Sequence, residues 1–447
     1  MGTASGSAVA RRRRQGFVDS LRDFLTPALW KQAHRARGGR RCPRWGTQPL
    51  LLTLLLLSWC AGESQAERFE TARACCAACL PSRRRPGRTV QGFHKALARV
   101  PLPALRALAT GIRRVLPGRL ARRWSDGGFV GLGCDGSRLE CPRGAELERR
   151  LGQAGKPRSA PAVWLTALVH LTTGVPWAWR WGRGTASERV HLRQLLPTLP
   201  AHTLLVADAG FFGFDLLGQV AAHGVWFLVR LSSGVWLYTE GQTPLARWRE
   251  GPVYYWPLQA QRQGRPPLRL RLVRVRGRKA DVWLLTNVVE RQRLTVAQAA
   301  TWYRRRWECE GLFRAYKRTL GKMKLVSRTV RLLHREAEGS LLALQLLLAQ
   351  GALALPGPRA AAAAAMASPR QLLVAVRQEL GALLRQRPSR WGLRARAARR
   401  ERRPRRSPKA RRAWPRRKPP RAPKPPHLRK LTDELRALIY RLEREAA

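Results

Sequence analysis

Residues 129–231 alternate between short apolar segments and amphipathic helices, and this pattern constrains the fold more than any other feature of the chain. Strands are predicted over 129–135, 162–170, 175–181, 203–208 and 225–231, and helices over 188–196 and 212–223. Three strands, a helix, a strand, a helix and a strand make a mixed α/β sheet. Two acidic residues, Asp135 and Asp208, lie at the ends of predicted strands.

The regions on either side of this core have different compositions and predict further parts. We expect a helical N-terminal domain over 1–120, because apolar stretches there alternate with basic clusters that suit DNA contact. The core occupies 121–231, a β-rich insertion 232–290, and a second core segment 291–355. Residues 356–447 form an Ala-rich and then Arg/Pro-rich tail. Within it, 385–430 is predicted to be disordered when free, and 432–445 to form a short amphipathic helix.

Within the insertion, residues 268–276 alternate apolar and basic side chains with one slip at Leu272-Val273. An alternation of period 2 predicts a strand with one buried face and one row of arginines, and the slip predicts a β-bulge. Residues 282–287 are expected to return to the main sheet.

The formal net charge is +59, from 86 Lys and Arg against 27 Asp and Glu. Such an excess repels itself in a compact state, so a polyanionic partner is expected. Nucleic acid is the first candidate and an anionic membrane surface the second. Residues 385–430 concentrate this charge. The apolar run 50–61 is shorter than the roughly 20 residues that span a bilayer, so we interpret it as a buried helix.

The eight cysteines have no regular spacing and do not predict a disulfide framework. Cys76 and Cys79 form a single CxxC pair without a second pair at the distance typical of zinc sites. Buried small side chains and a reducing, cytoplasmic location are therefore expected.

The unit of sequence that bears most on chemistry is Tyr303-x2-Arg306-x3-Glu310-x6-Lys317, in a helix predicted over 294–320. At about 100° per residue these four side chains fall within one stripe about 60° wide. A polar stripe faces either solvent or an active site. Composition alone favours a solvated charged face, and Leu312 and Tyr316 would then provide the packing face.

The spacing Tyr-x2-Arg-x3-Glu-x6-Lys resembles the signature of the insertion-sequence transposases of the insertion sequence four family. Cys134-Asp135-Gly136-Ser137 and Val206-Ala-Asp208-Ala-Gly-Phe211 resemble that family's first and second aspartate segments. The resemblance covers roughly 129–328. It implies an RNase H-like mixed sheet, with a β-rich insertion between the second Asp and the Glu, and a catalytic triad of Asp135, Asp208 and Glu310.

The same resemblance implies cofactors and further site residues. Two Mg²⁺ ions, with Mn²⁺ as a substitute, would be held by the three carboxylates, since hard oxygen ligands suit these ions. Arg306 and Lys317 would hold phosphates beside the cut and Tyr303 would donate to a phosphate oxygen. Trp302 and Trp307 could stack on a displaced base, with core packing as the alternative for each.

The implied activity is cutting of DNA strands at the ends of an insertion sequence and joining of these strands to target DNA. The partners would be terminal inverted repeats and target DNA, with a homodimer in the synaptic complex, no membrane, and a cytoplasmic, nucleoid-associated location. Two alternatives stay open. One is another metal nuclease such as a resolvase, and the other is a non-catalytic or decayed basic DNA-binding protein derived from a transposase.

Overall fold

The computed structural model describes residues 16–38, 45–81, 85–153, 158–277, 280–355, 366–399 and 424–446. It divides into two compact units. The first unit comprises Met1–Trp124, Gly136–Ala186 and Glu308–Glu401, and the second comprises Ser125–Asp135, Ser187–Trp307 and Arg402–Ala447. The basic cluster 11–14 and residues 400–423 of the basic region lie outside the described residues.

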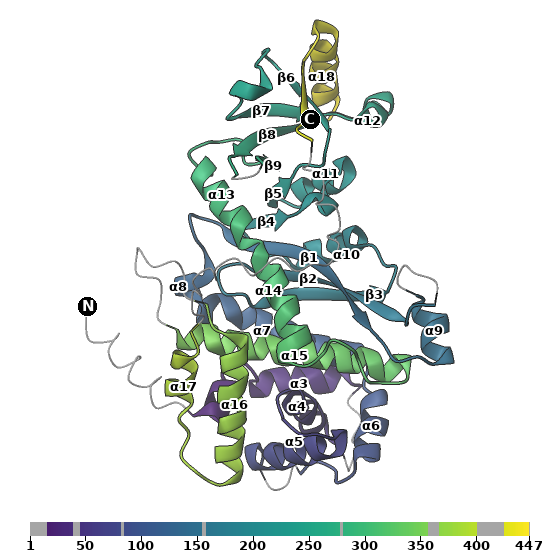
Figure 1. Cartoon of the computed structure of the whole chain (residues 1–447), viewed down its shortest axis with the longest axis vertical. Helices are drawn as coiled ribbons and strands as arrows, with labels where there is room; N and C mark the ends of the chain where they lie inside the picture. The colour runs from purple at the N-terminus through teal and green to yellow at the C-terminus, as the bar shows by residue number, and fades with distance from the viewer. Residues whose placement is uncertain are drawn as a thin grey trace, which may run out of the picture. The chain divides into compact units, whose positions relative to one another are not determined.

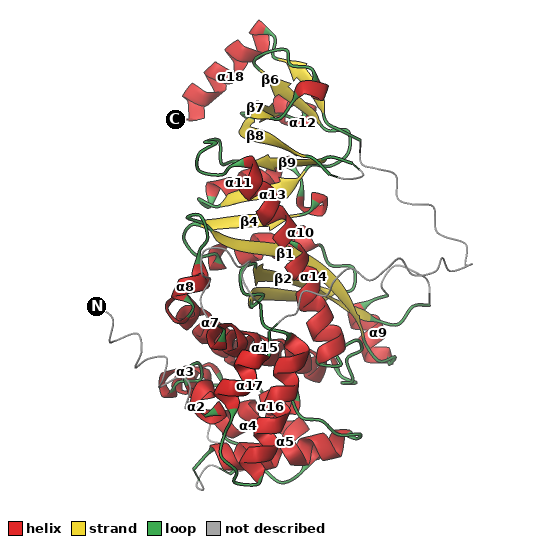
Figure 2. Cartoon of the chain, turned by 60° about the vertical axis from the view of Figure 1, so that its left-hand side comes forward, coloured by secondary structure: helices red, strands yellow, loops and turns green. Residues whose placement is uncertain are grey.

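The first unit is mainly helical and contains two strands of its own (Figures 1 and 2). Its helices are α2 (Phe17–Arg22), α3 (Pro27–Ala36), α4 (Thr47–Leu57), α5 (Gln65–Cys79), α6 (Val90–Ala98), α7 (Leu102–Arg119), α8 (Ala121–Trp124), α9 (Ala145–Leu151), α15 (Val330–Ala354), α16 (Pro369–Leu384) and α17 (Trp391–Ala397). Its strands are β2 (Ala162–His170) and β3 (Pro176–Arg183), an antiparallel pair.

Helix α15 is the central element of the first unit. It lies between the β2–β3 pair and α4 in both views (Figures 1 and 2), and its side chains are buried from Glu336 to Ala352. Gly339 allows close approach of α4, because a Cβ there would lie 2.5 Å from Leu54 Cδ2. By length and composition α15 could cross a membrane, but 89% of its most apolar window is buried inside the protein. It is thus a core helix.

Helix α4 confirms the buried helix expected over 50–61, since Thr47 and all residues from Pro49 to Leu56 are buried. None of the seven described cysteines forms a disulfide bond with another described residue. The N-terminal helices do not form a unit of their own, because they pack with α15 and α16 in the first unit.

The second unit is a mixed α/β structure with strand order β10-β6-β7-β8-β9-β5-β4-β1. Its elements are β1 (Val130–Glu140, which continues into the first unit), α10 (Glu188–Leu195), β4 (Thr203–Ala207), α11 (Phe214–Ala222), β5 (Trp226–Arg230), β6 (Trp236–Thr239), β7 (Glu250–Tyr255), α12 (Leu258–Arg262), β8 (Leu268–Val275), β9 (Val282–Thr286), α13 (Val296–Arg305), β10 (His427–Lys430) and α18 (Asp433–Ala446). The mixed α/β sheet predicted from the alternation is confirmed.

Strand β9 pairs with β5 and β8, which confirms its expected return to the main sheet. The prediction for β8 was wrong in two respects. Its register with β7 and β9 is continuous through Leu272 and Val273, so there is no bulge there. Arg271 does not belong to an exposed row: it is 1% exposed and donates to the carbonyl of Leu294.

The disorder predicted for 385–430 was wrong for part of that stretch, because α17 and β10 lie within it, whereas the amphipathic helix predicted over 432–445 is confirmed by α18. Helices α16 and α17 bury Leu372, Leu373 and Trp391 in the first unit. At the end of the chain, β10 pairs in parallel with β6, and α18 packs Ile439 against Trp256 of the insertion. The apolar residues of α16 and α17 are spaced to cover one face of each helix, a signal that the basic composition nearby obscured.

Candidate active site

Asp135 and Asp208 occupy matching positions on neighbouring strands of the second unit. Strands β1 and β4 are parallel, and Gly133 pairs with Val206 at the end of their ladder. Each aspartate follows its paired residue by two positions, so the two lie level with each other just beyond this ladder, with Asp135 inside β1 and Asp208 directly after β4. Adjacent strands are about 4.8 Å apart, and the charges of both aspartates act on the same neighbouring carboxyl group, that of Glu188.

The turn after β4 fixes the Asp208 carboxylate. All five residues of β4 are buried, and the strand ends where the polar Asp208 begins a short 3₁₀ turn over Ala209–Phe211. Asp208 Oδ1 accepts a hydrogen bond from the Gly210 amide at 2.8 Å. Arg189 Nε donates to the Gly210 carbonyl at 2.7 Å, so α10 and this turn are held together.

A third carboxylate, Glu188, lies beside these two and was not assigned a role from the sequence. A Cβ on Gly210 would lie 3.0 Å from Asp208 Oδ1 and 3.2 Å from Glu188 Oε1, so the two carboxylates face the same point. Burial, and then the charges of Asp135 and Asp208, raise the pKa of Glu188 to about 7. In the sequence Glu188 was only an acid in the first turn of a helix, a common position for one.

The donor chemistry of this cluster fits a divalent cation. Carboxylate oxygens are the ligands that Mg²⁺ prefers, and a cation would relieve the repulsion that the pKa of Glu188 reflects. Among the described residues, no group of three His, Cys, Asp or Glu side chains is already arranged to hold a metal ion. Asp135, Asp208 and Glu188 are the residues of the second unit that could do so.

Helix α13 ends at an arginine held between two aromatic rings. Arg306 lies between α13 and α14 (Trp307–Arg314), and its guanidinium carbon is 5.6 Å from the ring centroids of both Tyr303 and Trp307. Its Nε is buried and has no hydrogen-bond partner among the described residues. Trp307 is 59% exposed, which leaves part of its ring open to a ligand.

Trp302, in contrast, is a core residue. It is 3% exposed, and its ring lies over Gly131 of β1, where a Cβ would approach Cζ3 to 2.0 Å. Arg305 lies 4.7 Å from its ring centroid. Of the two interpretations offered for Trp302, core packing is therefore the one that its burial supports.

Glu310 and Lys317 belong to the first unit, whereas the two aspartates belong to the second. Glu310 is half-buried on α14, and Leu312 and Tyr316 are buried, as the predicted packing face requires. Lys317 lies in a π-helical segment (Ala315–Thr319), and its Nζ donates to Ser137 Oγ at 2.8 Å. Burial lowers the pKa of Lys317, and Glu140 opposes the shift. The continuous α-helix assumed from the sequence is thus interrupted at Arg306 and again at Ala315.

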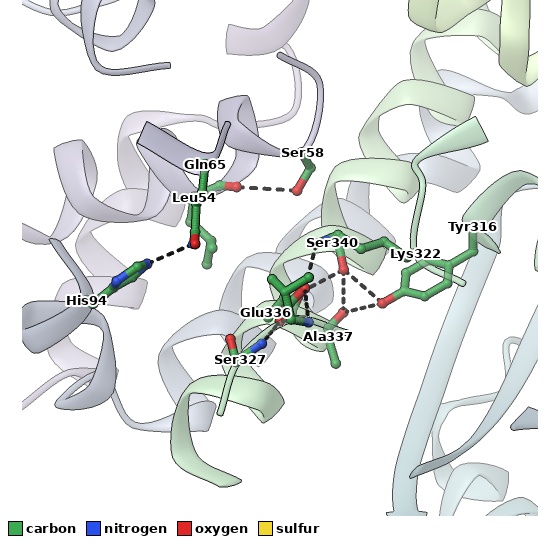
Figure 3. Close-up of polar contacts among 11 residues, drawn as sticks. Leu54, Ser58, Gln65, His94, Tyr316, Lys322, Ser327, Glu336, Ala337 and Ser340 are labelled. Carbon is green, nitrogen blue, oxygen red and sulfur yellow. Dashed lines mark hydrogen bonds and ion pairs between the residues drawn. The ribbon is translucent and has the colours of Figure 1, made fainter. Parts of the chain in front are cut away.

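The π-helical segment is held by a buried polar network (Figure 3). Tyr316 Oη lies 2.8 Å from Ser340 Oγ, which in turn donates to the Glu336 carbonyl. The Glu336 carboxylate accepts from Lys322 Nζ at 2.6 Å and from the Ser327 amide at 2.9 Å. These contacts fix the segment that carries Lys317 against α15. π-Helical turns inside α-helices often occur at functional sites.

Comparison with known proteins gives one family. Residues 132–346 match the model described as the transposase DDE domain, and this stretch contains Asp135, Asp208 and Glu310. The match supports a DDE transposase. It does not test the Tyr-Arg-Glu-Lys signature or the RNase H-like detail, which stay predictions.

A solved structure described as the piggyBac transposase synaptic complex with hairpin DNA is similar at a TM-score of 0.42 and 10% sequence identity. The similarity covers 82% of this chain and 80% of that one. At this TM-score the likeness carries no argument about the site. Comparison with curated proteins finds no match.

Proposed function

We propose that the protein is a metal-dependent transposase that cuts the ends of an insertion sequence and joins them to target DNA. The proposal rests on the agreement of two observations. Residues 132–346 match the transposase DDE domain, and this stretch contains two aspartates at matching positions on adjacent parallel strands. The sequence signature supplies Glu310 as the third carboxylate of the proposed triad. Glu188 is a further acid beside the two aspartates.

Two Mg²⁺ ions bound by the carboxylates would activate the attacking oxygen and stabilise the leaving oxygen of a phosphodiester. The residues of the chain orient the ions and the DNA. Asp208, fixed by the Gly210 amide, lies directly after β4, level with Asp135 of β1. Burial, and then the charges of Asp135 and Asp208, raise the pKa of Glu188, and a bound cation would favour its ionised form.

Basic and aromatic residues would hold the DNA at the site. Arg306 has a half-buried guanidinium between two rings, which limits its freedom and suits bidentate contact with a phosphate. Lys317 would bind a phosphate as a point charge, and Tyr303 would donate to one. Trp307 is the exposed ring that could stack on a displaced base.

The proposed partners are the terminal inverted repeats of its own element and target DNA, with two copies of the chain in the synaptic complex. The net charge of +59 favours a polyanionic partner and location on the nucleoid in the cytoplasm.

Incubation of the purified protein with its own flanking DNA ends and Mg²⁺ tests the proposal. Specific cuts at both ends that require Mg²⁺ are expected, with joined products when target DNA is added. Tight DNA binding without any cut would favour the alternative, a non-catalytic or decayed DNA-binding protein.

A further inference from the structure

A cavity of about 420 Å³ lies between α16 and α17 in the first unit, outside the stretch that matches the transposase DDE domain. Four arginines line this cavity: Arg385, Arg387, Arg390 and Arg394. Gln378 and Pro388 also contribute to its lining. Guanidinium groups this close together repel one another, and an anionic ligand in the cavity would neutralise them.

The loop that carries these arginines is held rigidly. Helix α16 ends in a Schellman motif, in which the Arg387 amide donates to the Ala382 carbonyl at 2.8 Å and the Gln386 amide to Leu383 at 3.2 Å. Gln386 has a φ of 53° at the left-handed position of this motif. The arginines that follow are therefore presented from a defined backbone.

One buried carboxylate fixes the other side of the loop. Glu379, 2% exposed, accepts from Ser389 Oγ at 2.5 Å, from the Arg390 amide at 3.1 Å and from Arg394 Nη1 at 2.5 Å. Ser389 Oγ also accepts from the Phe17 amide of α2. Because Glu379 pairs with Arg394, the other three arginines of the cavity, Arg385, Arg387 and Arg390, are left to bind a ligand.

The side chains of Arg385, Arg387 and Arg390 are exposed and form no ion pair within the part of the chain that the structure describes. An arginine-rich chain places many such residues on its surface, but these three converge on one cavity with a fixed backbone. Guanidinium groups match the paired oxygens of a phosphate, so a ligand with phosphate groups fits the cavity.

We propose that this arginine pocket binds the phosphodiester backbone of nucleic acid at a site separate from the proposed catalytic carboxylates. It would add affinity without sequence preference. The pocket extends the proposed function but does not depend on catalysis, because its residues belong to α16, α17 and the loop between them.

The test compares two variants of the full chain with the same net charge. Arg387→Gln with Arg390→Gln removes two pocket guanidiniums, whereas Arg370→Gln with Arg396→Gln removes two arginines that do not line the pocket. Fluorescence anisotropy with a labelled duplex of arbitrary sequence gives the affinity and its salt dependence. Loss of two phosphate contacts should lower the salt slope by roughly 2 and weaken binding about tenfold, with a smaller effect in the control. Thermal unfolding checks that both variants fold.

Equal DNA affinities and equal salt dependences for the two folded variants would overturn the proposal that this pocket binds nucleic acid. A wild-type protein that binds no DNA would instead overturn the proposed function. Inorganic phosphate is used to distinguish a pocket that binds the phosphates of nucleic acid from one that binds free phosphate. If phosphate raises the melting temperature of the wild type but not of the pocket variant, while DNA affinity is unchanged, the pocket serves free phosphate and the nucleic-acid proposal fails.

Discussion

Asp208 and Glu188 direct their carboxylates toward the same point, the place where a Cβ on Gly210 would lie, at 3.0 and 3.2 Å. Two acids from different elements, the end of β4 and the start of α10, are thus brought together beside Asp135. A side chain at this position would lie closer to both carboxylates than ordinary van der Waals contact. The carboxylate cluster therefore depends on a small residue in the turn as well as on the acids themselves.

Gly210→Ala should disturb this cluster without unfolding the protein. The added methyl group is closer to both carboxylates than ordinary contact, so one of them must move by a few tenths of an ångström. We expect Mg²⁺-dependent cleavage to fall about tenfold, because small displacements of catalytic groups are costly. Gly241→Ala is the control, since nothing lies within 4 Å of its Cβ position. Equal cleavage by the two variants would show that the position of these carboxylates does not matter.

Arg306→Ala should reduce strand cleavage far more than it reduces overall DNA affinity. A charge-assisted contact made to a phosphate in the transition state contributes roughly 1.5–3 kcal/mol, a loss of about tenfold or more in rate. Arg304, which is exposed and donates to Thr301 Oγ1, provides the matched control. Cleavage rates and binding are measured for both at matched stability. If the two variants cleave alike, the solvated-face interpretation of this helix is correct.

The two tryptophans on either side of the signature should respond in opposite ways. Trp302→Ala removes a buried ring from its place over Gly131 and should cost about 3–5 kcal/mol of unfolding free energy. Trp307→Ala should leave that free energy nearly unchanged, since the ring is 59% exposed, and should weaken cleavage. Chemical denaturation measures the first effect and a cleavage assay the second. A large loss of stability for Trp307→Ala would assign this ring to the core.

Glu336→Gln should make stability less dependent on acid pH. Burial alone would raise the pKa of Glu336, but Lys322 and the donors of residue 327 outweigh it and leave the pKa lowered. A lowered folded-state pKa contributes stability above the unfolded pKa, about 4.3, and this stability is lost as pH falls through the folded value. The variant should lose about 3 kcal/mol of unfolding free energy at pH 7, and the difference should shrink in acid.

Glu290→Gln serves as the comparison, because Glu290 is exposed and loses no ion pair within the described residues. Denaturation at pH 7 and in acid measures both variants. A constant difference between Glu336→Gln and the wild type across this range would exclude the ionised carboxylate as the source of the stability.

The sequence predicted the core well where periodicity is strong. The strands and helices predicted over 129–231 are all present, and Asp208 directly follows its strand as expected. Strand β1 instead runs on to Glu140, so that Asp135 lies within it, and α9 was not predicted. Periodicity does not report which distant residues meet. Glu188 meets Asp208 only in the folded turn at Gly210, which no local pattern reports. Core packing of Trp302 was an interpretation that the sequence already offered, and its partner Gly131 is what the structure adds.

Amino-acid composition gave wrong predictions in the segments that are rich in arginine. Arg271 was placed in an exposed row, and the segment that forms α17 was predicted to be disordered, because arginine dominates the sequence around them. A buried arginine is tolerated when a carbonyl and a carboxylate meet it, as Leu294 and Glu250 do for Arg271. Such partners are supplied by the tertiary structure and leave no local signal.

The central claim is that Asp135, Asp208 and Glu310 carry out metal-dependent cleavage. The most direct measurement compares Asp135→Ala, Asp208→Ala and Glu310→Ala with the wild type for cleavage of its own DNA ends in Mg²⁺, alongside DNA affinity. We predict that each variant loses cleavage while its affinity stays within about twofold, since binding comes from phosphate contacts made elsewhere. Robust cleavage by any one of the three folded variants would contradict the assignment of that residue to the site.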